Sequence, residues 1–445
     1  MFNKKTIRDV DLRGRVVLVR VDYNVPIEYS DDGQAEILND FRIKSSLPTI
    51  KYLLDLGVRK IVLISHMGRP ESVEGVADLN ELEKLPNGSR KFSLRPTFNR
   101  LIRLLAEDAG VDEHEFRLNF PMNFHSAPIF ARTRYSVPIA KADDDYKIEM
   151  LENLRFSKDE KRDSIEFAEA LVQVTGADLF VQDGFGVVHR AHASTDAITK
   201  LLPGVSGFLV EKEVSIISEA FQEPKRPFVA VMGGAKVGDK LPLIEKFIEK
   251  ADRILLAGAM ANTILSSRGF YLGNSKIEPG QNDVIAEIYE IARRKIKGHT
   301  NNFLVLPKDL AVADEFSSSA KRREIARDSV REGEIALDIG EITIDRFKNE
   351  LNDAGTIVWN GTVGYAEFPE FSKGSREIAE KISERTRFGA LTVVGGGDTS
   401  AFALNWSENS PEQDNFSLIS TGGGAALELM SGAILPGVEA LEDKK

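Results

Sequence analysis

The chain contains no cysteine among its 445 residues. This absence excludes thiol catalysis, thiolate metal sites and disulfide bonds, and it fits a protein of the cytosol. No apolar run approaches the length of a membrane-spanning helix. The N-terminal residues Met1–Lys5 are not followed by an apolar segment of signal-peptide length. We therefore expect a cytoplasmic protein without a membrane partner.

Acidic residues outnumber basic ones, 69 against 58, and the formal net charge is −11. This balance argues against general affinity for nucleic acid, so any anion-binding site must be a local basic island. Apolar residues make up 42% and charged residues 29% of the chain, which is typical of a globular protein. The length is sufficient for two or three domains with sizeable cores.

Apolar strands alternate with segments of helical periodicity in both halves of the chain. In the first half, Val16–Val21 and Lys60–Ser65 have the pattern of buried strands, and Arg42–Leu56 has that of a helix. In the second half, Leu241–Lys250 carries its apolar residues on one helical face, and about six strands are expected. Strands separated by helices predict parallel sheets. We predict an α/β fold of two doubly wound, Rossmann-like parallel-sheet domains joined by a helical hinge.

The best domain boundary lies between Leu201 and Arg226, where a turn-rich stretch precedes a helical segment. We expect four parts: an N-terminal domain over 1–205, a hinge helix over 206–226, a C-terminal domain over 227–425, and a tail over 426–445 that packs back on the N-terminal domain. The segment Glu71–Tyr146 is the least regular, and its part Glu71–Arg90 is predicted to be a solvated surface insertion.

Three glycine clusters, Gly233–Lys236, Gly395–Thr399 and Ser420–Gly424, each follow an apolar strand and precede a helix-like segment. A buried strand, a glycine turn and a helix N-terminus offer free backbone N–H groups without side chains that block approach. Three such clusters suggest one sheet whose strand ends share a polyphosphate ligand. The stretch Gly233–Lys240 is not a Walker A loop, because Asp239 stands where that motif requires Gly-Lys-Ser/Thr.

Two charged residues accompany these glycines. Lys236 is suited to place a point charge on a transferring phosphate. Asp398 is suited to hold Mg²⁺ that a nucleotide already carries, and it also fits an N-cap of the following helix.

Polar and basic side chains follow the predicted strands of the first half: Asp22, Asn24, Arg42, His66, Arg69, Arg155, His189, Arg190 and His192. In open parallel sheets, ligands bind outside the carboxyl ends of the strands. Arginine suits carboxylate and phosphate in two-point contact, so the set predicts a basic pocket, although any single arginine also fits a surface salt bridge. We expect His189 and His192 to be orienting or structural rather than catalytic.

The motifs resemble those of phosphoglycerate kinases. Four resemble the substrate half of that family: Val19–Pro26, Ser65–Pro70, Leu151–Phe156 and His189–His192. Four resemble its nucleotide half: Gly233–Val237, Trp359–Gly361, Gly395–Thr399 and Ser420–Gly424. The order matches end to end, so the resemblance covers nearly the whole chain. It implies a monomeric enzyme in which MgATP or MgADP binds opposite 3-phosphoglycerate or 1,3-bisphosphoglycerate.

The resemblance also implies a role for each matching residue. It places 3-phosphoglycerate in the N-terminal domain, at Asp22, Asn24, Arg42, His66, Arg69, Arg155 and Arg190. It places the nucleotide in the C-terminal domain, at Gly234, Ala235, Lys236, Lys240, Gly258, Asn360, Glu367, Gly396, Gly397, Asp398 and Thr399. Arg42, Lys236 and Gly396 are implied as catalytic, Glu367 as a ribose ligand, and Asp398 as the residue at Mg²⁺.

The implied reaction is reversible phosphoryl transfer between 1,3-bisphosphoglycerate with ADP and 3-phosphoglycerate with ATP, as in glycolysis and gluconeogenesis, with direct in-line transfer and hinge closure. A carboxylate nucleophile is ionised at neutral pH, so no general base is required. The reaction needs neutralisation of crowded negative charge, alignment and exclusion of water. The negative charge is neutralised by lysine, arginine, Mg²⁺ and helix N-termini. Domain closure supplies the alignment and the exclusion of water.

Some positions depart from the usual family pattern: Gly184 for Ala, Thr362 for Pro, Ala366 for Phe, and Ala257, Ala259 and Ala336 for Gly. These departures bear on nucleotide affinity and on the choice between ADP and GDP, and none removes a charged catalytic group. A non-catalytic sensor is an alternative, but it would be expected to lose Arg42, Lys236 or Asp398. A nicotinamide-dependent oxidoreductase would need Gly-x-Gly-x-x-Gly at the first strand–helix turn, which instead carries Asp22 and Asn24.

Overall fold

A computed structural model of the protein describes residues 2–73, 82–129, 146–296, 300–411 and 415–444. The chain forms two compact units. The N-terminal unit comprises Phe2–Val214 with Ile434–Lys445, and the C-terminal unit comprises Ser215–Ala433. Helix α6 (Phe208–Gln222) contributes residues to both. No helix in the described ranges is long and apolar enough to cross a membrane.

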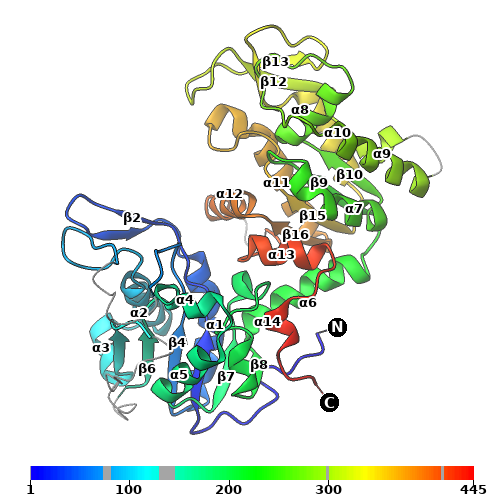
Figure 1. The fold of residues 1–445 in the computed structure, drawn as a ribbon. Helices are drawn as coiled ribbons and strands as arrows, with labels where there is room; N and C mark the ends of the chain where they lie inside the picture. Colours follow the sequence, from blue (N-terminus) through cyan, green and yellow to red (C-terminus); the bar gives the residue numbers. More distant parts are fainter. Residues whose placement is uncertain (1, 74–81, 130–145, 297–299, 412–414, 445) are drawn as a thin grey trace. The chain divides into compact units, whose positions relative to one another are not determined.

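The N-terminal unit is built on a six-stranded sheet in which all neighbouring strands are parallel (Figure 1). Its strand order is β5 (Met122–His125), β6 (Ile148–Leu151), β4 (Lys60–Ile64), β1 (Val16–Arg20), β7 (Leu179–Gln182) and β8 (Gly204–Ser206). The central strand β1 is buried along its whole length. A parallel sheet buried in this way has helices on both faces.

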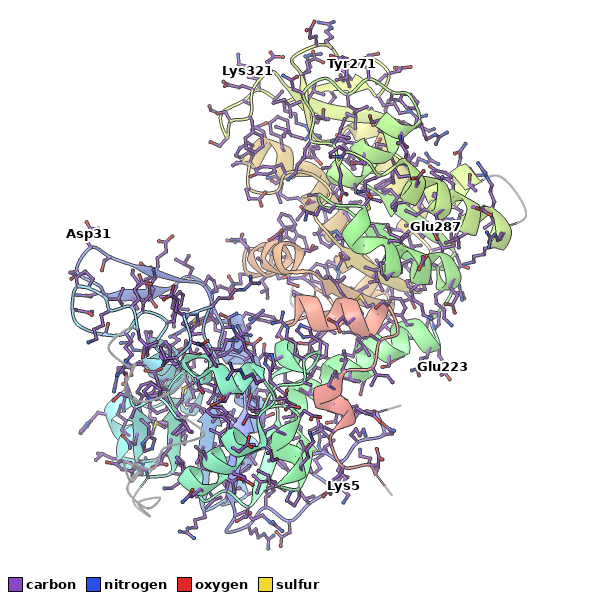
Figure 2. All side chains as sticks on the ribbon, viewed as in Figure 1. Lys5, Asp31, Glu223, Tyr271, Glu287 and Lys321 are labelled. Atoms are coloured by element: carbon purple, nitrogen blue, oxygen red, sulfur yellow. The ribbon has the colours of Figure 1, made fainter. Side chains whose placement is uncertain are left out.

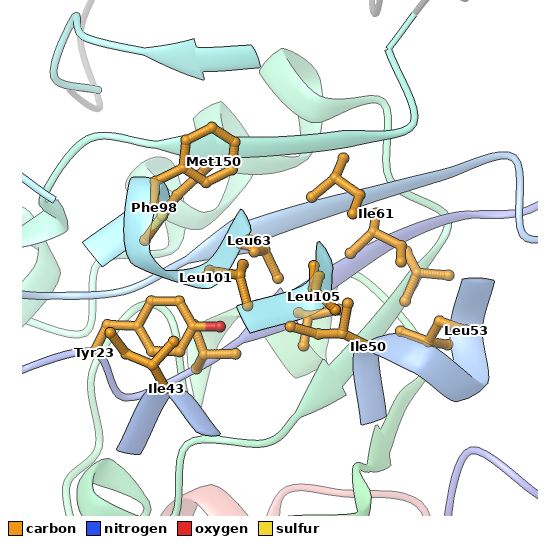
Figure 3. Packing of buried hydrophobic residues seen from close by; sticks show 14 of the residues in the cluster. Tyr23, Ile43, Ile50, Leu53, Ile61, Leu63, Phe98, Leu101, Leu105 and Met150 are labelled. Carbon is orange, nitrogen blue, oxygen red and sulfur yellow. The ribbon is translucent and has the colours of Figure 1, made fainter. Parts of the chain in front are cut away.

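Successive residues of β1 pack against different helices, because strand side chains alternate between the two faces. Val17 and Val19 share a cluster with residues of α1 (Phe41–Asp55) and α2 (Arg95–Ala109). Figure 3 shows Leu53 and Leu105 of these helices beside Ile61 of β4. Val16 and Leu18 pack instead with α5 (Ile165–Thr175).

The remaining elements of this unit are short. They are the hairpin β2 (Ile27–Tyr29) with β3 (Ala35–Ile37), the helices α3 (Glu113–Asn119), α4 (Lys158–Lys161) and α14 (Pro436–Glu439), and the 3₁₀ turns η2 (Leu154–Phe156), η3 (Phe185–Val187) and η4 (Ala197–Lys200). The C-terminal segment is tied to the unit by hydrogen bonds from Glu442 N to Gly204 O (2.9 Å) and from Gly437 N to Val188 O (2.8 Å).

The C-terminal unit contains a second six-stranded sheet, again with parallel neighbours. Its order is β11 (Leu304–Val305), β10 (Arg253–Leu256), β9 (Phe228–Met232), β15 (Thr356–Asn360), β16 (Leu391–Gly395) and β17 (Leu418–Ile419). Its helices are α7 (Leu241–Lys250), α8 (Gly258–Ser267), α9 (Asn282–Ile296), α10 (Glu341–Leu351), α11 (Lys373–Arg387), α12 (Gly397–Glu408) and α13 (Gly423–Met430), with the turns η5 (Gly238–Lys240), η6 (Thr300–Asn302) and η7 (Pro369–Ser372). The prediction of two doubly wound α/β domains is confirmed; the predicted hinge and tail bounds stay predictions.

Sequence analysis missed a small antiparallel sheet in the C-terminal unit. It has the order β13 (Arg323–Ala326), β12 (Asp309–Ala313), β14 (Ile335–Ile339). Strand β13 is largely exposed, so its sequence lacks the apolar signature of a core strand. Tyr271 and Lys321, which lies between β12 and β13, are among the outer side chains labelled in Figure 2.

The irregular segment Glu71–Tyr146 is more ordered than predicted. Strand β5 extends the main sheet beside β6. Within the predicted insertion, Val73 and Leu82 are buried in a cluster with Phe156, which corrects the interpretation of Glu71–Arg90 as fully solvated. Residues 74–81 of the insertion, and 130–145 beyond it, lie outside the described residues.

Candidate active site

Four neighbouring strands of the N-terminal sheet end at one edge, and the predicted substrate residues follow them. The strands are β6, β4, β1 and β7 in spatial order. Arg155 lies in η2 after β6, His66 follows β4, Asp22 follows β1, and Arg190 follows η3 after β7. Parallel strands bring their carboxyl ends to the same edge, which is where such sheets bind ligands.

Arg42, Asp22 and Asn24 form a connected group at this edge. Arg42, in the first turn of α1, has its Nη1 atom 3.1 Å from Asp22 Oδ2 and donates from it to Asn24 O over 2.7 Å. Asn24 Oδ1 in turn accepts from Gly68 N at 2.8 Å. These bonds hold the turn after β1 against the turn after β4.

His66 is buried and is held in one neutral form. Its Nδ1 lies 3.1 Å from Arg20 Nη2. A guanidinium group only donates hydrogen bonds, so Nδ1 accepts and the ring proton is on Nε2. Burial, followed by the charges of Arg20 and Arg155, holds the pKa of His66 well below its usual range. The imidazole is therefore neutral near neutral pH, where it can donate a hydrogen bond from Nε2 but cannot serve as an acid.

The remaining predicted arginines bring positive charge with little compensation. Arg155 is 6% exposed and donates from Nη1 to Gly68 O over 2.8 Å. Its Nε has no hydrogen-bond partner among the described residues. Burial, and then the charges of Arg20 and Arg190, lowers the pKa of Arg155 to about 10. Arg69 and Arg190 are exposed. Neighbouring guanidinium groups repel one another, so a set of them at one edge of a sheet is suited to bind an anionic ligand.

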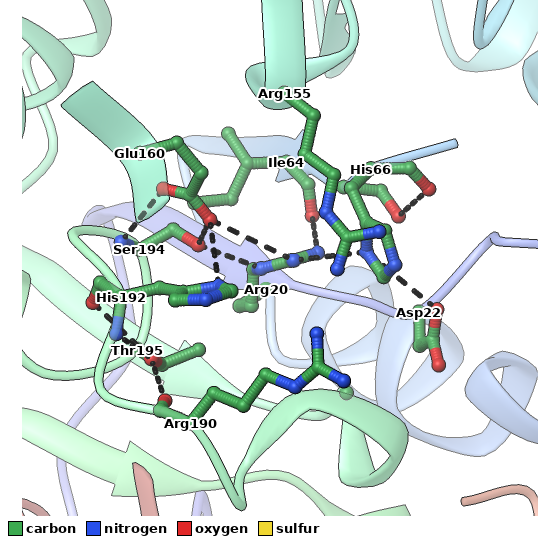
Figure 4. A network of polar contacts seen from close by, with 12 residues as sticks. Arg20, Asp22, Ile64, His66, Arg155, Glu160, Arg190, His192, Ser194 and Thr195 are labelled. Atoms are coloured by element: carbon green, nitrogen blue, oxygen red, sulfur yellow. Dashed lines mark hydrogen bonds and ion pairs between the residues drawn. The ribbon is translucent and has the colours of Figure 1, made fainter. Parts of the chain in front are cut away.

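Sequence analysis missed a buried network beneath these residues (Figure 4). Arg20, fully buried at the end of β1, donates from Nε to Ser194 Oγ over 2.8 Å. Glu160 of α4 is also fully buried, accepts from Ser194 Oγ (2.6 Å) and N (3.1 Å), and lies 4.0 Å from Arg20 Nη2. Burial raises the pKa of Glu160 despite the opposing charge of Arg20. The sign of this network in the sequence was an arginine within an otherwise apolar strand.

His192 belongs to the same network. It is 7% exposed, and its Nδ1 lies 3.8 Å from Glu160 Oε1. Burial, followed by the charges of Arg20 and Arg155, lowers the pKa of His192 to about 3. His189 accepts at Nε2 from Arg190 Nε over 3.1 Å.

In the C-terminal unit, glycine turns follow the strands β10, β9, β15, β16 and β17, which lie side by side in this order, and the turns after β10, β9 and β15 pack backbone against backbone. Gly361, at φ +95°, follows β15, and a Cβ atom there would lie 2.3 Å from Gly233 O. Gly258, at φ +63°, begins α8, and a Cβ there would lie 2.8 Å from Gly234 N. Side chains at these positions would separate the loops, so glycine is required for both conformation and space.

Lys240 and Asn360 lie beneath these loops. Lys240 Nζ donates to Gly233 O over 2.9 Å. Burial lowers the pKa of Lys240 to about 8, and the charge of Asp398 opposes that shift. Asn360 is 1% exposed, and its Nδ2 has no hydrogen-bond partner among the described residues. Lys236 is exposed on the loop that follows Gly234.

The first turn of α12 presents Gly397 and Asp398, both exposed. Gly396, at φ +94°, occupies the N-cap, and no side chain caps this helix, so Asp398 does not act as the N-cap residue. Thr399 is buried, and its Oγ1 accepts from Gly361 N over 2.7 Å. This bond joins the turn after β15 to the helix that follows β16.

A cavity of about 500 Å³ opens beside these loops. Gly234, Ala235, Gly258, Glu367 and Asp398 line one part of it, and Leu310, Ile335, Ala336 and Leu337 of the small antiparallel sheet line another. The described residues contain no cluster of three or more histidine, aspartate or glutamate side chains able to hold a metal by themselves. A single carboxylate such as Asp398 suits Mg²⁺, which commonly takes its other ligands from phosphates and water.

Comparisons with known proteins agree over nearly the whole chain. A sequence profile of the family described as "Phosphoglycerate kinase" matches residues 7–433. A protein of that name from Chloroflexus aurantiacus is 41% identical over 442 residues, which is 99% of this chain and 100% of the relative. One from Akkermansia muciniphila is 42% identical, with 99% and 98% covered. The solved phosphoglycerate kinase from Coxiella burnetii is similar in structure, with a TM-score of 0.75, 31% identity and 98% of each chain covered.

Proposed function

The chain belongs to the phosphoglycerate kinase family, and from this we propose how its residues divide the work of the reaction. The protein is a phosphotransferase with a carboxyl group as acceptor. It transfers a phosphoryl group between 1,3-bisphosphoglycerate with ADP and 3-phosphoglycerate with ATP, a step of glycolysis. The finer assignments below are proposals.

The phosphoglycerate binds in the N-terminal unit at Asp22, Asn24, Arg42, His66, Arg69, Arg155 and Arg190. The observation that best supports this is the buried Arg155, whose Nε has no hydrogen-bond partner in the described part of the chain and whose pKa is lowered by burial and then by neighbouring arginines. A phosphate or carboxylate would accept from that Nε and offset the like charges. The neutral His66 adds an Nε2–H donor, while Arg42 is held by Asp22 and Asn24.

The nucleotide binds in the C-terminal unit at Gly234, Ala235, Lys236, Lys240, Gly258, Asn360, Glu367, Gly396, Gly397, Asp398 and Thr399. Asn360 Nδ2, which has no hydrogen-bond partner within the described ranges, and the first turn of α12, which has no side-chain cap, supply donors for phosphate oxygens. Glu367 meets the ribose, and Asp398 would hold Mg²⁺ together with the phosphates. The bound ion would neutralise phosphate charge.

Arg42, Lys236 and the backbone of Gly396 stabilise the charge that develops on the transferring group. The acceptor carboxylate is ionised near neutral pH, so the chain needs no base. The depressed pKa values of His66 and His192 agree with this requirement, because both rings stay neutral. We also propose a cytoplasmic monomer without a nucleic-acid or membrane partner, and light scattering would then give a mass near 49.3 kDa.

The deciding experiment is a coupled assay that contains 3-phosphoglycerate, ATP and Mg²⁺. We expect turnover that disappears when EDTA removes the metal. Calorimetric titration with 3-phosphoglycerate and with ADP measures whether each ligand binds, independently of turnover. Binding of both ligands without turnover would favour the alternative of a non-catalytic sensor.

A further inference from the structure

The loop between β9 and α7 carries Lys236, and its first two residues are firmly attached. Gly233 N donates to Asn360 O over 3.0 Å. Gly234 N donates to Thr362 O over 3.2 Å. Both acceptors belong to β15 or to the turn that follows it. These bonds precede Lys236 by two residues or more, so they do not by themselves orient the peptide groups of Lys236.

Glu278 provides a contact at Lys236 itself. Its Oε2 atom accepts from Val237 N over 2.5 Å and from Gly238 N over 3.3 Å. Val237 N belongs to the peptide group that joins Lys236 to Val237, and a peptide group is planar. The carboxylate therefore holds the plane that follows the Cα atom of Lys236. The fully buried side chain of Val237 anchors the loop at the next position.

These two N–H groups lie at the beginning of the turn η5. Val237 occupies the N-cap of this turn, and its side chain makes no capping hydrogen bond. The first N–H groups of a helical turn lack an acceptor inside it, so Glu278 provides the cap from a distant segment. A hydrogen bond from a backbone N–H to a carboxylate is roughly twice as strong as one between neutral groups.

The segment that carries Glu278 is itself held on two sides. Glu278 N donates over 3.0 Å to Oγ1 of Thr263, a residue of α8 that is 3% exposed. Ser275 Oγ accepts from Ala336 N of β14 over 2.8 Å. Both α8 and β14 contribute residues to the wall of the C-terminal cavity. Glu278 thus attaches the loop of Lys236 to the elements that line this cavity.

We propose that Glu278 is a positioning residue for phosphoryl transfer: it holds the peptide group between Lys236 and Val237, and so keeps the Lys236 side chain directed at the transferring phosphoryl group. The proposal rests on the proposed function, because it names what positions Lys236 in that reaction. Glu278 touches neither substrate in this role and acts through Lys236. Misplacing a group by about 1 Å can cost about a hundredfold in rate, so such a tether matters for turnover.

A double-mutant cycle on kcat tests whether Glu278 acts through Lys236. With ATP and 3-phosphoglycerate, Glu278→Ala should lower kcat by about tenfold and change each KM by less than about threefold, because the binding residues remain. In the Lys236→Ala background, the same change should lower kcat by less than about twofold, since the side chain that it positions is already absent. Independent effects would instead multiply.

Three further variants complete the cycle. Glu278→Gln keeps an oxygen that can accept from Val237 N but lacks the charge, so its kcat should lie between those of Glu278→Ala and the native chain. Glu287→Ala, an exposed change on α9 (Figure 2), is the matched control and should leave kcat and KM unchanged. Circular dichroism reports whether each variant is folded. If Glu278→Ala is not, Glu278→Asp, whose carboxylate is one methylene shorter, replaces it.

Amide hydrogen exchange provides a readout that needs no substrate. Glu278→Ala removes the acceptor of Val237 N and Gly238 N, so exchange of these amides should become faster by about tenfold or more. Glu287→Ala should leave their exchange as it is in the native chain. Mass spectrometry of peptides that cover residues 235–240 measures the rates.

Unchanged exchange at these amides in Glu278→Ala would overturn the proposal, because the carboxylate would then not hold the loop. An unchanged kcat in Glu278→Ala would overturn it as well, and so would effects of Glu278→Ala and Lys236→Ala that multiply. Failure of the proposed function looks different. The native chain would then show no turnover, while exchange at Val237 and Gly238 would still respond to Glu278→Ala.

Discussion

Arg20 Nη2 lies 3.1 Å from His66 Nδ1 and, because a guanidinium can only donate, it fixes the imidazole as its Nε2–H tautomer. The same arginine lies 4.0 Å from Glu160, so one buried cation connects the ring at the strand edge to a carboxylate in α4. The protonation state of His66 is thus set from inside the protein and not by solvent.

This relationship predicts that His66 does not titrate in the range where histidines usually do. Burial and the charges of Arg20 and Arg155 hold its pKa well below its usual range, so its ring should stay neutral at the pH near 6.5 where an unperturbed histidine takes up its proton. Two-dimensional NMR with ¹⁵N-labelled histidine measures this, and the His66→Gln variant identifies the signals. A protonation step of His66 above pH 6 would contradict the assignment.

Glu160→Gln is predicted to destabilise the N-terminal unit strongly. The substitution preserves a group that accepts from Ser194 but removes the charge opposite Arg20, and breaking a buried pair in this way costs about 3–5 kcal/mol. Urea denaturation measures the loss. Glu169→Gln, an exposed change on α5, is the control and should cost less than about 0.5 kcal/mol. Equal stability of the two variants would show that Arg20 does not depend on Glu160.

Asp183 should make stability depend on pH in a direction unusual for a carboxylate. It is fully buried, and although Leu209 N and Thr49 Oγ1 donate to it, burial raises its pKa to about 8. Its folded pKa is above the value of about 3.9 expected in the unfolded chain, so the native state binds the proton more tightly. The stabilisation is fully present below pH ~4 and is lost as the pH rises through about 8.

Asp183→Asn removes this titration. The difference in unfolding free energy between the native chain and the variant should therefore favour the native chain more at pH 5 than at pH 8. Urea denaturation at both values measures the difference. Asp31→Asn, an exposed change in the turn between β2 and β3, should show no such trend. The same difference at both pH values for Asp183→Asn would refute the shift.

Arg42→Ala and Lys236→Ala are each predicted to lower kcat far more than they weaken binding. Both side chains are proposed to meet charge that develops during transfer, so each loss should be about 2–4 kcal/mol in the barrier, by analogy with other charge-stabilising donors. Steady-state kinetics with 3-phosphoglycerate and ATP give kcat and KM separately. An unchanged kcat with a raised KM would indicate ground-state binding instead.

The sequence alone was sufficient to predict the α/β architecture and the types of residue that follow the strands. Strand–helix alternation predicted both sheets, and α7 has the predicted bounds. Position relative to the strands also indicated Asp22, His66 and Arg155, because parallel strands bring their carboxyl ends together. These inferences depend on local periodicity, which a single sequence carries.

The missed features depend on contacts between distant segments. Arg20 and Glu160 are 140 residues apart, and only folding brings them together; the lone sign was a charge in an apolar strand. The wall formed by β12 and β14 was missed although both strands are largely buried, because a single sequence does not show which short apolar segments pair, and their neighbour β13 is exposed.

The glycine loops provide the last prediction, since two glycines of the C-terminal unit share a conformation but differ in surroundings. Gly361 has φ +95°, and a Cβ there would lie 2.3 Å from Gly233 O. Gly269 has φ +89°, and a Cβ there would have no atom of the described residues within 4 Å. Gly269→Ala should therefore cost only backbone strain, about 1–2 kcal/mol of unfolding free energy.

Gly361→Ala adds a collision that must push apart the two loops proposed to bind phosphates. We expect calorimetry to show lost affinity for nucleotide in Gly361→Ala alone, while both variants bind 3-phosphoglycerate, the ligand of the other unit, as the native chain does. Equal nucleotide affinity in the two variants would mean that the contact between these loops does not shape the site.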